Sequence, residues 1–141
     1  MKMTVTKIDV ATSQLKEAIN LFFEERDPVS IHTLVGAALQ ILNDHITDKS
    51  VILNNNLFLH KDSLYIKDEY RKEWVDAINK AKNFFKHADR DIVKGVLSLE
   101  FETEVNDFNI FGALQSLKIL NSEIHENTLE FCFFDKVHII V

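Results

Sequence analysis

The chain has 141 residues, 16 Lys and Arg against 22 Asp and Glu, a net charge of -6, and 46% hydrophobic residues. This length and composition are typical of one globular domain, so we expect a single domain over 1–141. Three glycines and one proline are too few for the many tight turns of a β-sandwich or β-barrel, which favours a mainly α-helical fold.

Two amphipathic helices are predicted near the start of the chain. Over 13–26 the apolar side chains recur at helical spacing, and Ser13 is suited to be the N-cap. Pro28 is expected to end this helix and, with Asp27 as N-cap, to begin a second helix over 28–46 with a broad apolar face. The short junction predicts that the two helices pack as antiparallel or steeply crossed neighbours.

An irregular connector and a long helix are predicted next. Residues 47–68 hold three apolar triplets separated by polar residues, which predicts short turns with room for one 3₁₀ or strand piece. Residues 68–87 show the clearest helical period in the chain, and Asp68 can cap this helix. We expect its aromatic ridge, from Tyr70 to Phe85, to be clamped between the first two helices.

The last part of the sequence combines a strand signal, a helix and an ambiguous tail. An alternating stretch predicts a short strand near 96–101, and helical spacing returns over 107–121. The tail, 127–141, alternates like a strand but also begins with a helix-cap pattern, so its pattern leaves both structures open. The tail is too apolar for exposure to water, so either it is buried or it forms a dimer contact. The sequence as a whole predicts a helical bundle of four or five helices with a minor short strand.

A first candidate site lies at the junction of the two predicted N-terminal helices. Arg26 is permanently charged and precedes Asp27, and His32 titrates near neutrality. Arg26 and His32 could therefore stabilise charge on a phosphate and move a proton during RNA cleavage. The alternative is structural: Arg26 pairs with the acidic helix end while His32 borders the core. This spacing arises often by chance, which favours the structural interpretation.

A second candidate site lies at the end of the long middle helix. Asn83 and His87 are one turn apart on the same flank, and Lys86, His87 and Arg90 could together hold an anion such as a phosphate. The stretch 67–90 has more basic than acidic side chains inside a negative protein. The alternative is that these basic residues complement the dipole of the helix C-terminus.

Other classes of site have no local signal in the sequence. The six histidines lack metal-ligand spacing, the single cysteine, Cys132, cannot form an internal disulfide, and glycine-rich phosphate loops are absent. We therefore expect no metal and no cofactor. The sequence has no apolar run of about 18 residues and no signal-peptide core, which predicts a cytoplasmic protein without membrane contact.

Two stretches resemble a family of small uncharacterised bacterial helical proteins. The D-P-x-x-x-H-T-L junction that begins at Asp27 and the K-N-F-F-K-H-A-D segment that begins at Lys82 recur together in that family. The resemblance covers 20–91 and implies a bacterial protein with a helical tail, but no activity. A looser likeness is to the HEPN superfamily of helical ribonucleases and nucleotide-binding domains, whose arginine, polar residue and histidine are matched by Arg26, Asp27 and His32.

Two functions follow as predictions. The first is a non-catalytic binding or interaction module, with a homodimer and RNA or a nucleotide as candidate partners. The alternative is a HEPN-like ribonuclease or nucleotide-binding protein, in which His32 acts as acid and base and Arg26 holds the phosphate. Catalysis requires Arg26 and His32 to be exposed together in one concave site, with Lys86 or His87 within reach. A sealed His32 favours the binding module.

Overall fold

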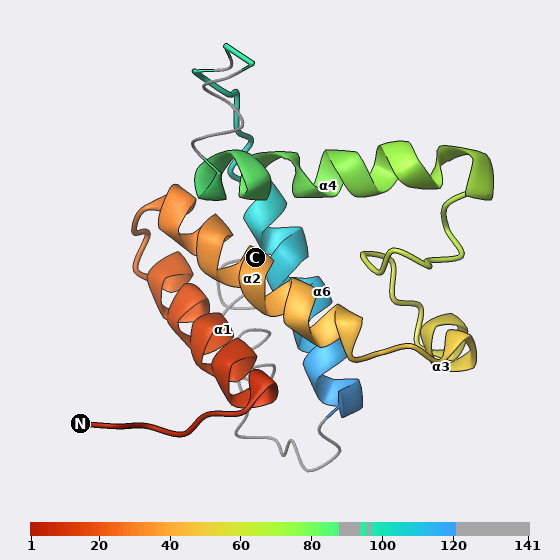
Figure 1. Cartoon of the computed structure of the whole chain (residues 1–141), viewed down its shortest axis with the longest axis horizontal. Coiled ribbons are helices and arrows are strands. Elements are labelled where there is room, and N and C mark those ends of the chain that lie inside the picture. Colours follow the sequence, from red (N-terminus) through yellow and green to blue (C-terminus); the bar gives the residue numbers. More distant parts are fainter. Residues whose placement is uncertain (88–93, 96, 121–141) are drawn as a thin grey trace.

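Three helices lie side by side in the body of the protein, and a fourth crosses one end of them (Figure 1). The computed structural model describes residues 1–87, 94–95 and 97–120. Its elements in chain order are α1 (Lys7–Phe23), α2 (Pro28–Asp44), α3 (Lys49–Asn54), the 3₁₀ turn η1 (Asp68–Tyr70), α4 (Arg71–Lys86) and α6 (Val105–Leu120). The prediction of a mainly helical fold is confirmed, since every regular element in these residues is a helix.

The core forms where α1, α2 and α6 bring their apolar stripes together. Helix α2 is central, because it packs on α1, on α6 and on α4. The fully buried side chains include Leu15 of α1, Val35 and Leu42 of α2, and Ile110 and Leu114 of α6. Burying such side chains supplies about 1.5–3 kcal/mol each, which makes this three-helix contact the main source of stability.

Helix α1 begins earlier than predicted because a capping box precedes it. The Asp9 backbone N–H donates to Thr6 Oγ1 at 3.0 Å, and the Thr6 N–H donates to Asp9 Oδ2 at 3.0 Å. Ala11 then extends the buried stripe towards the N-terminus. Ser13 therefore lies inside the helix, and its predicted role as N-cap is wrong.

Helix α1 also ends earlier than predicted, in a Schellman cap. The Arg26 N–H donates to the Leu21 carbonyl at 2.9 Å. The Glu25 N–H donates to the Phe22 carbonyl at 3.2 Å. Glu25 has a φ of 53°, in the left-handed region where glycine is usual. This turn, rather than the proline that follows, terminates α1 at Phe23.

Helix α2 begins as predicted, with Asp27 at the N-cap and Pro28 at the first helical position. The Asp27 carboxylate accepts hydrogen bonds from the N–H groups of Val29 and Ser30, both at 3.2 Å, and from the Ser30 hydroxyl at 2.6 Å. The Ser30 hydroxyl is the main cause of the lowered pKa of Asp27, and the Val29 N–H adds to it. Asp27 is therefore engaged as a cap.

The connector after α2 contains the short helix α3 and is tied to α4 by one arginine. The Arg71 guanidinium donates to the backbone carbonyls of Lys61 (2.7 Å), Ser63 (3.0 Å) and Ile66 (3.0 Å). It also donates to the Asp68 carboxylate at 2.9 Å. Asp68 thus holds Arg71, and the prediction that it caps the long helix is wrong, since Tyr70 precedes α4 without a side-chain cap.

Helix α4 is docked less firmly than the sequence predicts. None of its residues is buried, and Tyr70 immediately before it is 55% exposed. Its C-terminal half crosses α2, and its N-terminal half extends past the body of the protein (Figure 1). The aromatic ridge is therefore not clamped between α1 and α2.

The short strand predicted near 96–101 is not formed over 97–101. A strand needs a neighbouring segment to complete its hydrogen bonds, and no described segment pairs with these residues. Phe101 instead packs edge-to-face on His32 and Phe85, with ring centroids 4.8 and 5.2 Å away. The predictions for the tail, 127–141, lie outside the described residues.

Candidate ligand-binding site

His32 lies in the second turn of α2 and is only 1% exposed. Its Nδ1 is 2.9 Å from Oδ1 of Asn106 on α6. The Asn106 amide nitrogen donates to the Pro28 carbonyl at 3.0 Å, which orients the amide oxygen towards the histidine. Nδ1 is therefore the protonated nitrogen. The other nitrogen, Nε2, is buried and has no hydrogen-bond partner.

The surroundings of His32 keep its imidazole neutral. Burial lowers its pKa below the ordinary 6.5, and the charge of Lys82 acts in the same direction. The hydrogen bond to Asn106 opposes this shift without reversing it. The Nε2 lone pair is thus a free acceptor at neutral pH.

A hollow of about 690 Å³ opens between α4 and the segment that leads into α6. His32 lines it, together with apolar side chains from several elements. The main ones are Phe58, Trp74, Ile78, Leu99, Phe101, Val105 and Phe108. A space of this size with mostly apolar walls is typical of small-molecule sites.

Two further polar groups on the walls of this hollow are unpartnered. Trp74 Nε1 is buried without a hydrogen-bond partner. Asn109 of α6 is 6% exposed, and its amide bonds to nothing in the described part of the chain. Trp74 offers a donor, His32 an acceptor, and Asn109 both. The hollow therefore presents three unused hydrogen-bonding groups among mostly apolar walls, which also include the charged side chains of Lys80, Glu100 and Glu102.

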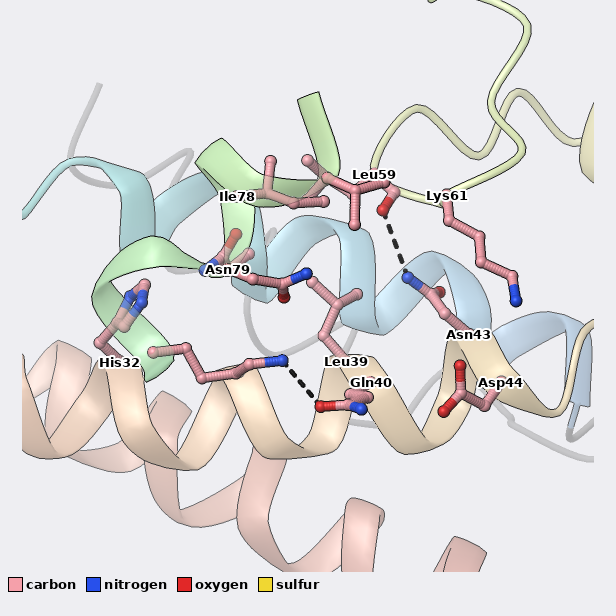
Figure 2. Close-up of a pocket in the computed structure, with 13 residues that line it drawn as sticks. His32, Leu39, Gln40, Asn43, Asp44, Leu59, Lys61, Ile78 and Asn79 are labelled. Carbon is pink, nitrogen blue, oxygen red and sulfur yellow. Dashed lines mark hydrogen bonds between the residues drawn. The ribbon is translucent and has the colours of Figure 1, made fainter. Parts of the chain in front are cut away.

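A second, smaller cleft of about 240 Å³ lies on the other side of α4, between α4 and α2. His32 lies at one end of it, and Asp44 and Lys61 lie at the other (Figure 2). Between them, Lys82 Nζ donates to Gln40 Oε1 at 2.7 Å. The cleft has a larger share of polar side chains on its walls than the hollow, although apolar side chains line both.

The cleft and the hollow adjoin each other beneath α4. Both are lined by the same four residues, His32, Leu59, Ile78 and Asn109. Two of these, His32 and Asn109, carry two of the three unpartnered polar groups. We treat the two adjoining spaces as one candidate site, in which the cleft has the larger share of polar side chains.

The backbone of α2 fixes the position of Lys82. A Cβ at Gly36 would lie only 3.0 Å from Cδ and 3.1 Å from Cγ of Lys82. The glycine thus lets the lysine stem cross α2 at close range. Burial lowers the pKa of Lys82, Lys86 adds to this effect, and Asp44 opposes it.

The structure separates the predicted catalytic residues. Arg26 and Asp27 are exposed at the turn between α1 and α2, and His32 is buried. Arg26 lines a shallow hollow with Glu25 and Pro28 that His32 does not line. The geometry that catalysis requires, with both residues exposed in one concave site, is not observed.

The predicted anion-binding residues lie at the C-terminal end of α4. Asn83 and Lys86 are exposed there, and His87 is partly buried. None of these three lines the hollow or the cleft. Arg90, the fourth member of the set, lies outside the described residues.

Sequence reasoning missed three residues of the site. The sequence pattern places Trp74 on the aromatic ridge from Tyr70 to Phe85 and Lys82 within the basic stretch 67–90, and neither position by itself indicates a site. Asn109 received no role, although it shares a buried face of α6 with Asn106 and Ile110. Two asparagines at helical spacing on an apolar face are the signal that could have revealed it.

Comparison with protein-family models gives no match, and no similar curated protein or solved structure is found. The resemblances to a bacterial helical family and to the HEPN superfamily therefore stay predictions. No helix in the described part of the chain has the length and apolar character needed to cross a membrane. Nor do three or more metal-binding side chains gather within these residues.

Proposed function

We propose that this protein is a non-catalytic binding module that takes a flat, largely apolar ligand into the hollow beneath α4. The observation that carries the proposal is that His32, whose buried Nε2 has no hydrogen-bond partner, lines that hollow. A buried acceptor without a partner costs about 1–3 kcal/mol. A ligand with an N–H or O–H group would recover this free energy.

The walls of the hollow define the shape of the ligand. The aromatic rings of Trp74, Phe101 and Phe108 favour a planar ring by stacking and edge contacts. The Trp74 N–H and the Asn109 amide can then fix its orientation. A planar ring or heterocycle that combines an apolar face with hydrogen-bonding edges fits this arrangement, and the ring of a nucleotide belongs to this class.

The arrangement of charges supports binding rather than catalysis. A general acid and base must exchange its proton with the substrate, and burial disfavours the protonated form of His32. Arg26, which would hold the phosphate in a ribonuclease, lies at a different hollow.

The test uses a pair of probes that differ in a single hydrogen-bond donor. Naphthol carries a hydroxyl, and methoxynaphthalene has the same rings without the donor. We expect naphthol to bind about tenfold more tightly, because one recovered hydrogen bond is worth about 1.4 kcal/mol. Binding is measured by calorimetry, and the indole N–H resonance of Trp74, the one tryptophan of the sequence, reports the location.

The variant His32→Phe should remove the preference for naphthol, since it keeps an apolar ring but loses the acceptor. His45→Phe is the matched control, because it makes the same change at an exposed histidine of α2's C-terminal end. It should retain the preference. Equal affinity of the two probes for the wild-type protein, or an unshifted Trp74 resonance, would overturn the proposal.

A further inference from the structure

We infer that the ligand of this site carries one acidic group, such as a carboxylate, which lies in the polar cleft beside Lys82 while its ring occupies the apolar hollow. The inference rests on the proposed function and adds the charge of the ligand to it. The two spaces share four lining residues and therefore adjoin each other beneath α4, so one molecule that occupies both would place its ring and its acidic group on either side of these residues.

The ammonium group of Lys82 is positioned rather than free. Its stem is partly buried against Gly36, and its Nζ donates to Gln40 Oε1 at 2.7 Å. An ammonium carries three protons, so this hydrogen bond leaves donors available for a ligand. A partly buried, oriented cation binds an anion more strongly than a lysine in open water.

The charges that line the cleft favour a single negative charge on the ligand. Lys82 and Lys61 are cationic, Asp44 is anionic, and burial keeps His32 neutral. The cleft therefore has an excess of one positive charge, which a monoanion neutralises, whereas Lys80, Glu100 and Glu102 give the walls of the hollow an excess of one negative charge, so the acidic group belongs in the cleft. The amide of Asn79, which also lines the cleft, can donate to the same acidic group.

The volumes of the two spaces are consistent with an acidic group in the cleft and a ring in the hollow. The cleft, at about 240 Å³, has room for an acidic group and its water, and its charged and amide side chains suit such a group better than an apolar ring. The hollow, at about 690 Å³, is large enough for a fused pair of rings. His32 and Asn109 lie where the two meet and can bind polar groups between ring and acid.

The experiment compares naphthol with a hydroxynaphthoate whose hydroxyl and carboxylate are on the same ring but are not neighbours. This pair differs by the carboxylate alone. We expect the wild-type protein to bind hydroxynaphthoate about tenfold more tightly by calorimetry, which corresponds to one charge-assisted hydrogen bond. Both probes should shift the Trp74 indole resonance.

Two variants test the role of Lys82. Lys82→Gln should abolish the preference for hydroxynaphthoate and leave the affinity for naphthol unchanged. Gly36→Ala keeps the charge but displaces the lysine stem, so it should weaken the same preference. Lys72→Gln, at an exposed position of α4 that lines neither space, is the control and should behave like the wild type.

The outcomes separate this inference from the proposed function. Suppose that naphthol binds and shifts the Trp74 resonance while hydroxynaphthoate binds no more tightly. The inference that the ligand carries an acidic group is then refuted, and the proposed function as a binding module is retained. A preference that survives in Lys82→Gln also overturns the assignment of the acid to the cleft. If neither probe shifts Trp74, the proposed function fails, and the inference fails with it.

Discussion

The side chain of His32 lines both the cleft and the hollow of the candidate site. One ring nitrogen is fixed by Asn106, which is fixed in turn by the Pro28 carbonyl. The other nitrogen is left for a ligand. The sequence indicated that His32 would border the core or act as an acid and base, but it could not show which nitrogen was engaged, because that depends on α6, which lies far away in the chain.

The free energy of unfolding should depend on pH through His32. Burial lowers its pKa in the folded protein, so the unfolded chain binds more protons as the pH falls through about 6.5. Above that pH, His32 is neutral in both states and the free energy of unfolding is at its full value. Below it, the free energy of unfolding decreases until the pH falls past the lowered pKa of His32 in the folded protein, where the decrease stops. Urea unfolding at about pH 7.5 and about pH 5.5 measures the loss.

The comparison with His32→Phe isolates this effect from the other histidines. The wild type should lose more stability than the variant between the two pH values, since only the wild type has a group at position 32 to protonate. Equal losses would show that the imidazole of His32 protonates as readily in the folded protein as in the unfolded chain.

At the scale of the element, local caps decide where helices begin and end. The α1 helix starts at a capping box and stops at a left-handed Glu25, and both features override the signals that Ser13 and Pro28 provide. Thr6 and Asp9 have the spacing of a capping box in the sequence, so the start of α1 at Lys7 was predictable. A left-handed glutamate was not, because glutamate has no preference for that conformation.

Replacing Glu25 by glycine should stabilise the protein. Glycine adopts the left-handed backbone without steric strain, so Glu25→Gly should raise the free energy of unfolding by about 0.5–1 kcal/mol. Urea or thermal unfolding measures this change. The neighbouring Glu24 has a φ of -84°, so Glu24→Gly is the control and should give no gain. A lower stability for Glu25→Gly would contradict the cap described above.

Helix α6 depends on a close approach at Gly112. A Cβ there would lie 2.6 Å from Cδ1 and 3.3 Å from Cβ of Leu59, which is itself 7% exposed. Gly112→Ala should therefore destabilise the protein by about 1–3 kcal/mol in urea unfolding, despite the better helix propensity of alanine.

A double variant identifies the cause of that loss. Leu59→Ala removes the side chain that the new methyl group would meet, so Gly112→Ala should cost less in its presence than in the wild type. Additive losses in the double variant would show that the contact with Leu59 is not responsible.

For the whole molecule, the sequence predicted the helices better than their assembly. The three core helices follow from apolar periodicity, since residues such as Leu15, Val35 and Ile110 repeat at helical spacing. The alternation near Phe101 looked like a strand because periodicity reports which side chains face inward, and not whether a partner strand exists. Likewise, the spacing of apolar residues in α4 showed that the helix is amphipathic. It did not show that the apolar face of α4 would line a hollow instead of packing in the core.

The weak docking of α4 has a consequence for motion. No residue of α4 is fully buried and none belongs to the core cluster, so we expect the helix to open locally while α1, α2 and α6 keep their contacts. Its backbone amides should therefore exchange with deuterium faster than those in the middle of α2, and low urea should change their rates little. Uniform protection across the four helices would contradict this. Local opening of this kind gives a molecule access to the interior without unfolding of the bundle, and a bound molecule would slow the exchange of the α4 amides.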